Sequence, residues 1–509
     1  MGQQPTRESV TRSIWMAQTP LSGDRGGELA AETECDVCVI GAGMAGLSTA
    51  YQLVSAGKRV LVLDSGPVAG GESARTTAHL ASALDDRFHR LEKLHGADGA
   101  RLAAESHGAA IDSIEQIARG EDIACDFQRV DGFLFAGGGP TDELDRELEA
   151  AQRAGLSVER MGESCWSWFD TGPCLRFRNQ AEFQPLRYLS GLARAIERRG
   201  GRIVTGVRAT RLEGGKRCRV MARDRRVHAG ALVVATNSPV HGVLAIHGKQ
   251  AAYRSYVIAA EVPAGEIPHA LYWDTLDPYH YVRVARADRS ETEWLIVGGE
   301  DHRTGQENDG EVRFARLVEW TRERFPMAGE VAMRWSGQVM EPADGLAFIG
   351  PSPGLHPNVY LATGDSGNGL THGALAGVLL GDLILGRENP WARLYDPSRV
   401  SMRALGELAR EGLNVAAQYA DWLAPGDVSD PDKLAPGSGA VMRRGLRKIA
   451  VYRDPDGVLH RRSATCPHLG GVVAWNAVEG TWDCPCHGSR FDPLGRVLSG
   501  PARRDLGRD

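Results

Sequence analysis

Short apolar runs alternate with longer stretches of helical spacing along most of the chain. The apolar runs lie at 35–41, 59–64, 201–207 and 231–236, and the helical patterns lie at 44–56, 97–119, 141–154 and 186–199. Such an alternation is typical of α/β and mixed domains, in which helices cover a sheet. We therefore expect an α/β fold for the region from about residue 36 to about residue 400.

The pattern changes on both sides of this region. Residues 1–30 are polar and predict an extended N-terminal arm. Residues 421–439 contain three Pro, three Gly and four Asp, a composition that favours a linker. Beyond it, strand-like runs such as KIAVY and turns such as DPDG predict a small all-β module. The expected boundaries are the arm at 1–30, the main domain at 31–402, a linker at 403–436 and the module at 437–509.

Length, charge and cysteine content narrow the class of protein. The 509 residues can form several domains, and the net charge of −6 provides no basic field for nucleic acid. The longest apolar stretch, 375–386, is too short to span a membrane and contains Asp382. Nine unevenly spread cysteines indicate reduced thiols and a metal site rather than a disulfide framework. Because the first residues also lack an apolar secretory segment, we expect a cytoplasmic protein.

The run CVIGAGMAG, residues 38–46, passes from an apolar strand straight into a helical pattern. Gly41 permits a tight turn, Gly43 lets backbone amides approach a pyrophosphate, and Gly46 lets helix and strand pack closely. Asp64 ends the next strand, where a carboxylate can accept a hydrogen bond from a ribose hydroxyl. The alternative is a tight turn without a ligand. The flanking elements and the acidic residue favour a dinucleotide site.

Two further glycine-rich segments distinguish between the common dinucleotides. The loop at 70–82 follows the second strand and contains Arg75, which suits a pyrophosphate and a flavin. Far downstream, residues 358–384 read as another strand, glycine-rich turn and helix. A compact nucleotide does not need two such turns far apart in sequence, whereas an extended FAD, held at both ends, does. FAD is therefore the expected cofactor.

These segments resemble the FAD-dependent oxidoreductases of the D-amino-acid and glycine oxidase superfamily. The resemblance rests on the glycine run above, on EFQPLRYLSGLARAIERRGGRIVTG (182–206), on VVAT (233–236) and on WSGQVMEPADGLAFIGPSP with ATGDSGNG (335–369). It implies a Rossmann-type FAD-binding domain with an inserted mixed-sheet substrate subdomain, which acts on a small molecule. The residues that it places around FAD are Gly41, Gly43, Gly46, Asp64, Arg75, Thr76, Val207, Gly364 and Gly369.

The substrate subdomain would include the run YHYVRVAR, residues 279–286. In a strand, Tyr279, Tyr281 and Arg283 share one face. If that face looks at the flavin, Arg283 would pair with a carboxylate and Tyr281 would orient an amine or a carbonyl, so these two are the catalytic candidates. The alternative is a half-exposed strand with ordinary aromatic residues. We expect His372, near the second glycine-rich turn, to be structural or to contact the flavin rather than act as a base.

Two short loops in the last part of the chain each pair a cysteine with a histidine. Cys466 and His468 belong to the first loop, and Cys484 and His487 to the second. Zinc can use two cysteines and two histidines, but its usual motifs keep like ligands together. One thiolate and one imidazole per loop suit a two-iron cluster in which one iron takes both cysteines and the other both histidines. A zinc ribbon is the alternative.

The segments CPHLGG, WDCPCHGSRFD and DPLGRVLSGPA resemble the Rieske [2Fe–2S] family. The resemblance implies that the two cysteines named above hold the inner iron and the two histidines the outer, more exposed iron. Cys486 lies outside these pairs. In the respiratory branch of the family, the equivalent residue forms a disulfide with a cysteine where this chain has Gly471, so Cys486 is expected to be a free thiol.

FAD accepts two electrons and a Rieske cluster carries one, so their fusion suggests an enzyme that divides electron pairs. The first hypothesis is a dehydrogenase that oxidises an amine or amino acid and passes electrons through the cluster to an external one-electron carrier. The second is a reductase in which electrons run inward from cluster to flavin. The third is a flavin oxidase acting alone, with the cluster as a redox sensor or docking module. Removing residues 437–509 would separate the first hypothesis from the third.

Overall fold

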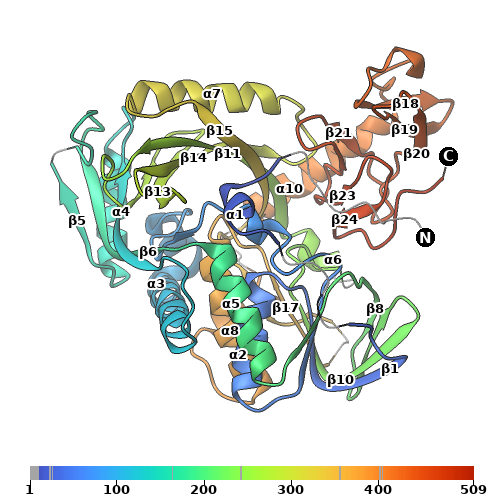
Figure 1. The fold of residues 1–509 in the computed structure, drawn as a ribbon, viewed down its shortest axis with the longest axis horizontal. Coiled ribbons are helices and arrows are strands. Elements are labelled where there is room, and N and C mark those ends of the chain that lie inside the picture. The colour runs from blue at the N-terminus through green and yellow to red at the C-terminus, as the bar shows by residue number, and fades with distance from the viewer. Residues whose placement is uncertain are drawn as a thin grey trace.

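The chain forms a larger part built from two sheets and long helices, and a smaller part of short strands (Figure 1, upper right). The computed structural model describes residues 11–21, 25, 27–162, 164–240, 244–354, 357–400, 403 and 405–508.

The first sheet has a parallel centre of apolar strands. Its order is β16 (Phe348–Pro351), β17 (Val359–Thr363), β10 (Arg225–Val234), β1 (Glu32–Ile40), β2 (Val60–Leu63) and β7 (Arg202–Val204), with β9 (Cys218–Ala222) and β8 (Ala209–Glu213) continuing from β10. All four residues of β2 are buried, as expected of a strand covered on both faces. Helices α2 (Met44–Ser55), α5 (Pro185–Arg198) and α8 (Gly369–Ile384) pack beside one another on this sheet, and their apolar residues belong to the main core (Figure 1).

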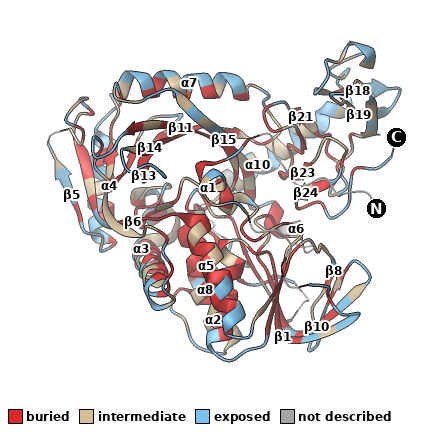
Figure 2. Cartoon of the chain, viewed as in Figure 1, coloured by how far each residue is buried: buried red, intermediate tan, exposed pale blue. Residues whose placement is uncertain are grey.

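The second sheet is mixed and is inserted between strands of the first. Its order is β15 (Val331–Pro342), β11 (Gln250–Pro263), β14 (Thr292–Arg303), β13 (His280–Arg286), β12 (Leu271–Asp274), β4 (Gln128–Phe135), β6 (Cys174–Glu182) and β3 (His79–Leu80), with β5 (Val158–Met161) on β6. Helix α7 (Gly310–Arg324) packs on β11 and β14, and its outer side is exposed (Figure 2). Helices α3 (Phe88–Gly120), α4 (Asp142–Arg153) and α9 (Ala392–Tyr395) complete the larger part.

The smaller part consists of two antiparallel sheets. The first runs β18 (Gly439–Arg444), β19 (Arg447–Arg453), β20 (Leu459–Ser463), and the second runs β21 (Ala474–Asn476), β22 (Thr481–Asp483), β23 (Arg490–Phe491), β24 (Val497–Ser499). Helix α10 (Leu405–Gln418) leads into it, followed by the short turns η3 (Tyr419–Trp422) and η4 (Pro431–Lys433). Much of the expected linker at 403–436 is therefore ordered against its neighbours.

The N-terminal segment differs from the expected extended arm. Residues Ile14–Gln18 form helix α1, with Ile14 and Trp15 buried. The Trp15 indole Nε1 donates to the carbonyl of Thr76 at 2.6 Å, and the Ser13 hydroxyl donates to the carbonyl of Ala74 at 2.6 Å. These contacts tie α1 to the loop after β2, a pairing that local polarity does not reveal. Residues 1–10 lie outside the described part of the chain.

The predicted α/β domain, its mixed-sheet insertion and the all-β module are all present. Within the described residues, no helix is both long and apolar enough to cross a membrane.

Candidate functional site

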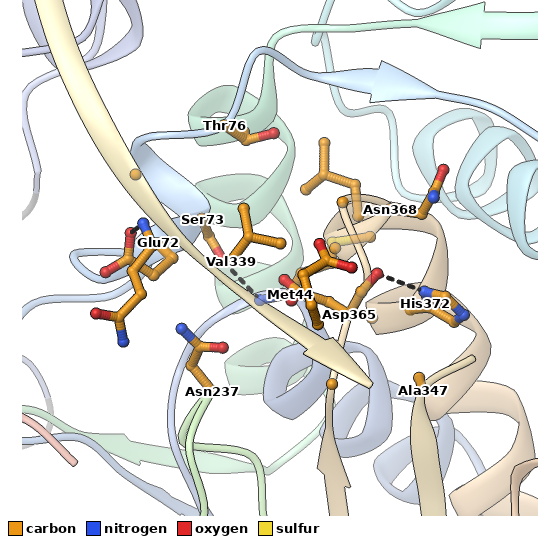
Figure 3. Close-up of a pocket in the computed structure, with 18 of the residues that line it drawn as sticks. Met44, Glu72, Ser73, Thr76, Asn237, Val339, Ala347, Asp365, Asn368 and His372 are labelled. Carbon is orange, nitrogen blue, oxygen red and sulfur yellow. Dashed lines mark hydrogen bonds between the residues drawn. The ribbon is translucent and has the colours of Figure 1, made fainter. Parts of the chain in front are cut away.

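The turn between β1 and α2 is built so closely that two of its glycines admit no side chain. Gly41 has a φ of 112°, and a Cβ there would lie 2.2 Å from the carbonyl oxygen of Ala235. A Cβ at Gly46 would lie 1.9 Å from the carbonyl oxygen of Gly41, so helix α2 can approach the turn only with glycine at this position. Gly43 caps α2, and the first amide of the helix, that of Met44, donates to the Ser73 hydroxyl at 3.1 Å (Figure 3).

A cavity of about 760 Å³ opens from this turn and extends between the two sheets. Its volume lies within the range of cofactor and ligand pockets. At the turn end, Asp64 accepts hydrogen bonds from the amides of Ala42 and Gly66, both at 2.7 Å. Val207, whose amide donates to the carbonyl of Asp64 at 2.9 Å, also lines this end.

The second glycine-rich turn, between β17 and α8, lies at the middle of the cavity. Gly364 has a φ of 73°, and a Cβ at Gly369 would lie 2.6 Å from a carboxylate oxygen of Asp365. The His372 ring donates from Nδ1 to the carbonyl of Asp365 at 2.8 Å (Figure 3). Burial lowers the pKa of His372 to about 4, so the ring is neutral and holds the turn in shape.

Thr76 and Arg75 line the middle of the cavity, but they differ in orientation. Thr76 faces the cavity (Figure 3). The Arg75 guanidinium is buried and donates to the carbonyl of Ser336 at 2.6 Å and pairs with Glu479 at 3.3 Å. Its charge is therefore compensated by the C-terminal module rather than directed at a pyrophosphate.

The two catalytic candidates on β13 lie in different environments. Tyr281 lines the cavity, and its hydroxyl is 2.6 Å from that of Ser255. Arg283 is buried elsewhere: its guanidinium lies 3.3 Å from Glu182 and donates to the carbonyl of Ala78 at 2.6 Å. The structure therefore does not bring Arg283 to the cavity, and its position does not favour the expected role in binding a carboxylate.

The two Cys/His loops of the C-terminal module lie against each other. Cys466 and Cys484 are 2% exposed, and their thiols are within hydrogen-bonding reach. The rings of His468 and His487 lie edge to face, with 5.1 Å between centroids. Among the described residues, no three His, Cys, Asp or Glu side chains are arranged to hold one metal ion. The predicted ligands form a pair of thiols and a pair of imidazoles, whereas a structural zinc site holds four ligands around one point.

The loop nitrogens and sulfurs fit a two-iron cluster. The Nδ1 of His487 is buried without a hydrogen-bond partner among the described residues, as expected of an atom that binds a metal. Burial lowers the pKa of both His468 and His487 to about 4, which leaves both rings in the neutral form that ligates metals. Cys486 is a free thiol, and its sulfur would lie 2.5 Å from a Cβ placed on Gly471. Gly471 therefore lies where the respiratory branch of the Rieske family is expected to carry the disulfide partner of Cys486.

Comparison with known families identifies both parts of the chain. The pattern of the FAD dependent oxidoreductase family (DAO) matches residues 36–383, which is well over half of the sequence. The chain belongs to this FAD-dependent oxidoreductase family. The pattern of the Rieske [2Fe–2S] domain matches residues 425–507, so the oxidoreductase carries a Rieske domain that begins before the expected residue 437.

Relatives and solved structures agree with this division. A Rieske 2Fe-2S iron-sulfur protein of Bacillus subtilis, YhfW, is 30% identical over 99% of both chains. A cytochrome b6-f complex iron-sulfur subunit of Prochlorococcus marinus is 32% identical over 27% of this chain and 72% of its own. Glycine oxidase from Geobacillus kaustophilus superposes with a TM-score of 0.60 at 16% identity, covering 72% of this chain and 99% of its own. L-proline dehydrogenase from P. horikoshii gives 0.58 at 13% identity, covering 72% and 98%. At these identities the two structures show a shared fold.

The oxidoreductase domain binds FAD and the Rieske domain binds a [2Fe–2S] cluster. The cavity fits FAD because two glycine-rich turns from distant parts of the chain line it, as an extended dinucleotide held at both ends requires. The predicted residues that line the cavity and would hold it are Gly41, Gly43, Asp64, Arg75, Thr76, Val207, Gly364 and Gly369, whereas Gly46 lies behind the turn. Residues that the sequence did not reveal also line the cavity: Glu72, Ser73, Asn237 and Gln338 (Figure 3 labels the first three).

The Rieske domain of the oxidoreductase completes part of the cavity wall. Leu498, Ser499 and Gly500 line the cavity, and a Cβ on Gly500 would lie 2.9 Å from Val240 of the oxidoreductase domain. The Gln338 side chain of β15 donates to the carbonyl of Gly488, next to the predicted ligand His487, at 3.1 Å. Gln338 also lines the FAD cavity, so one side chain contacts both cofactor sites.

A buried network of six charges joins the two domains. The Rieske residues Glu479, Asp483 and Arg490 meet Glu72, Arg75 and Arg254 of the oxidoreductase domain. Burial acts to raise the pKa of Glu479, but Arg75, Arg254 and Arg490 lower it to about 2. Sequence analysis missed this network because its members are far apart in the chain, such as Arg75 and Glu479 at a separation of 404 residues, and follow no local spacing.

Proposed function

We propose that the protein oxidises a small amine or amino acid at FAD and passes the electrons one at a time through the Rieske domain to an external one-electron carrier. The observation that supports electron transfer between the two domains is the double contact of Gln338, which lines the FAD cavity and donates to the predicted cluster loop. A sensor or docking module would not need such close contact with the cavity wall.

The chemistry divides between the two cofactors. FAD supplies two-electron oxidation by accepting a hydride, and the cluster carries single electrons. For an amine, loss of a hydride from carbon and a proton from nitrogen gives an imine, which water hydrolyses to a carbonyl compound and ammonia or a smaller amine. The protein's part is to orient the substrate: Tyr281, bound to Ser255, is positioned in the cavity to do so. This role of Tyr281 belongs to the proposal.

The location is also part of the proposal. Cys486 lies as a buried thiol beside Gly471, which suits a reducing compartment such as the cytoplasm.

A variant without the cluster tests the electron route in the full-length chain. Truncation is unsuitable because it would leave Arg75 and Arg254 buried without Glu479. Cys484→Ser keeps the interface and removes a predicted iron ligand. We expect substrate to reduce its FAD anaerobically at the parent rate, while reduction of an external one-electron carrier such as cytochrome c is lost. Unchanged carrier reduction would favour a flavin oxidase acting alone. In the parent protein, rapid FAD reduction by a chemically reduced cluster, with no reduction by any substrate, would favour inward electron flow.

A further inference from the structure

The end of the cavity beyond the second glycine-rich turn is rich in carboxylates. They come from separate elements, which converge only in the folded chain. They are Asp85 and Asp86 before α3, Asp301 in β14, Glu341 in β15 and Asp365 after β17.

Two of these carboxylates keep oxygens free. Asp301 accepts a hydrogen bond from the Tyr279 hydroxyl at 3.3 Å through Oδ2 and lies within reach of the Ser255 hydroxyl. Its Oδ1 is buried and has no well-formed hydrogen bond among the described residues. Asp85 is open to the cavity but enclosed by protein, and in the described part of the chain it makes no hydrogen bond or ion pair. The charge of Asp301 contributes to the raised pKa of Asp85, after the larger effect of burial, so both face one space. By contrast, Asp86 pairs with Arg90 at 3.1 Å.

The cations of the cavity wall are already engaged within the protein. Arg75 pairs with Glu479, Arg87 donates to the carbonyl of Asp274 at 3.1 Å, Arg90 pairs with Asp86, and Arg208 donates to the carbonyl of Val497 at 2.7 Å. No lysine occurs among the described residues that line the cavity. Burial lowers the pKa of His79 to about 3, so this ring is neutral as well. Arg87 also lies 3.8 Å from Glu143. A substrate carboxylate would therefore meet several carboxylates and only cations that already have partners.

Aromatic rings complete an environment for a positive charge. The rings of Tyr279 and Tyr281 lie 5.7 Å apart between centroids, and both are electrostatically coupled to Asp301 and Asp85. Carboxylates and tyrosine rings both attract ammonium groups, and they do so more strongly in an enclosed site than in water.

We propose that this cavity takes a cationic amine that has no carboxylate beside the reacting carbon, and that a diamine or polyamine is its substrate class. One ammonium group sits between Asp85 and Asp301, and a second, deprotonated nitrogen is the one oxidised. The oxidation part of this inference rests on the proposed function. The binding part is independent of it.

The affinity for an ammonium ligand should increase with pH, as expected of a site that binds a cation through carboxylates. Burial raises the pKa of Asp85 to about 7 and that of Asp301 to about 6. An ammonium ligand needs both groups ionised, so its affinity rises between about pH 5.5 and about pH 7.5. A carboxylate ligand would show the opposite trend. The charged and titratable groups that face them are Arg87 and Asp86 around Asp85, and Arg313, Glu300 and Tyr279 around Asp301.

Anaerobic titration of the FAD- and cluster-loaded protein tests the inference. The probes are putrescine and spermidine, compared with glycine, D-alanine and L-proline. Binding is followed by calorimetry and by perturbation of the FAD spectrum, and oxidation by bleaching of FAD. We expect the two amines to bind, and Asp85→Asn and Asp301→Asn each to raise their Kd about ten-fold or more. Glu307→Gln, an exposed position with the same change in charge, serves as the control and should leave Kd unchanged.

The outcomes separate this inference from the proposed function. Amine binding that weakens in both variants but produces no bleaching would support the cation site and contradict the proposed oxidation. An amino acid that bleaches FAD while the amines fail to bind would overturn the cation site and leave the oxidation intact. Equal Kd values in the parent and both variants would also overturn it. Melting temperature and FAD content of each variant establish that the fold is retained.

Discussion

Gly46 lies where helix α2 comes closest to the turn that precedes it. A methyl group there would lie 1.9 Å from the carbonyl oxygen of Gly41, a backbone atom that cannot move without shifting β1. We therefore expect Gly46→Ala to lower the melting temperature and to leave most of the purified protein without FAD. The ratio of flavin to protein absorbance and thermal unfolding measure the two effects.

Gly108 offers a matched control within helix α3. No atom lies within 4 Å of the position a Cβ would take there. Since alanine is favoured over glycine in helices by roughly 0.5–1 kcal/mol, Gly108→Ala should be neutral or slightly stabilising. Equal FAD content in both variants would contradict the tight-turn interpretation.

Cys484 and Cys486 are close in sequence and in space, yet only one is a predicted iron ligand. We expect Cys484→Ser to abolish the visible and paramagnetic signals of the cluster, and Cys486→Ser to retain them with two irons per chain. Cys486 contacts Gly471 instead of a disulfide partner, so its removal leaves no group unpaired. The reverse result would show that the ligand order is wrong.

At the scale of elements, the sequence pattern predicted those features that depend on residues close together in the chain. The glycine spacing around Gly41 placed a strand, a turn and a helix correctly, because the tight approach of Gly46 to Gly41 is set within a few residues. The position of the Arg283 side chain could not be predicted in this way. Its alternation with Tyr281 in β13 was correct, but its partner Glu182 lies on β6, about a hundred residues earlier. Helix α1 was missed for the same reason, since Trp15 is fixed by a distant carbonyl of Thr76.

The turn η3 supports the first cluster loop through two donors. The Trp422 indole donates to the carbonyl of Gly470 at 3.0 Å, and the Tyr419 hydroxyl donates to the carbonyl of Leu469 at 2.7 Å. Loss of one such bond costs about 1 kcal/mol, so Trp422→Phe should speed loss of the cluster to a chelator about five-fold. Leu423→Ala, at a position that is 78% exposed, is the control. Identical rates in the two variants would mean that η3 does not hold the loop.

At the scale of the whole molecule, the buried charges between the domains make the interface sensitive to single changes. Glu479 is 1% exposed and faces three arginines. Removing one member of a buried ion network leaves the others uncompensated, at a cost of about 3 kcal/mol or more. We expect Glu479→Gln to lower the melting temperature by several degrees, whereas Asp456→Asn, an exposed position in the same domain, should have no effect. Differential scanning calorimetry of both variants measures this.

The same carboxylate predicts how acid affects the interface. The pKa of Glu479 is lowered to about 2 in the folded chain, against about 4.3 in an unfolded one. Its contribution to stability is therefore complete above about pH 4.3 and is lost as the pH falls towards about 2. The parent should lose more stability over this interval than Glu479→Gln does. Parallel loss in both proteins would assign the acid sensitivity to other groups.

His247 of α6 (Leu244–His247) packs against both histidines predicted to bind the cluster, with ring centroids 4.8 Å from His468 and 6.0 Å from His487. The Rieske domain is thus already seated on its neighbour, and no diffusive search precedes transfer between the two cofactors. That transfer should be first-order, and insensitive to glycerol, to ionic strength and to protein concentration. Delivery to a separate carrier, which must find the exposed edge at Leu469, should slow with viscosity and depend on carrier concentration. A single enzyme would then show two kinetic regimes, one set inside the molecule and one set by the solvent around it.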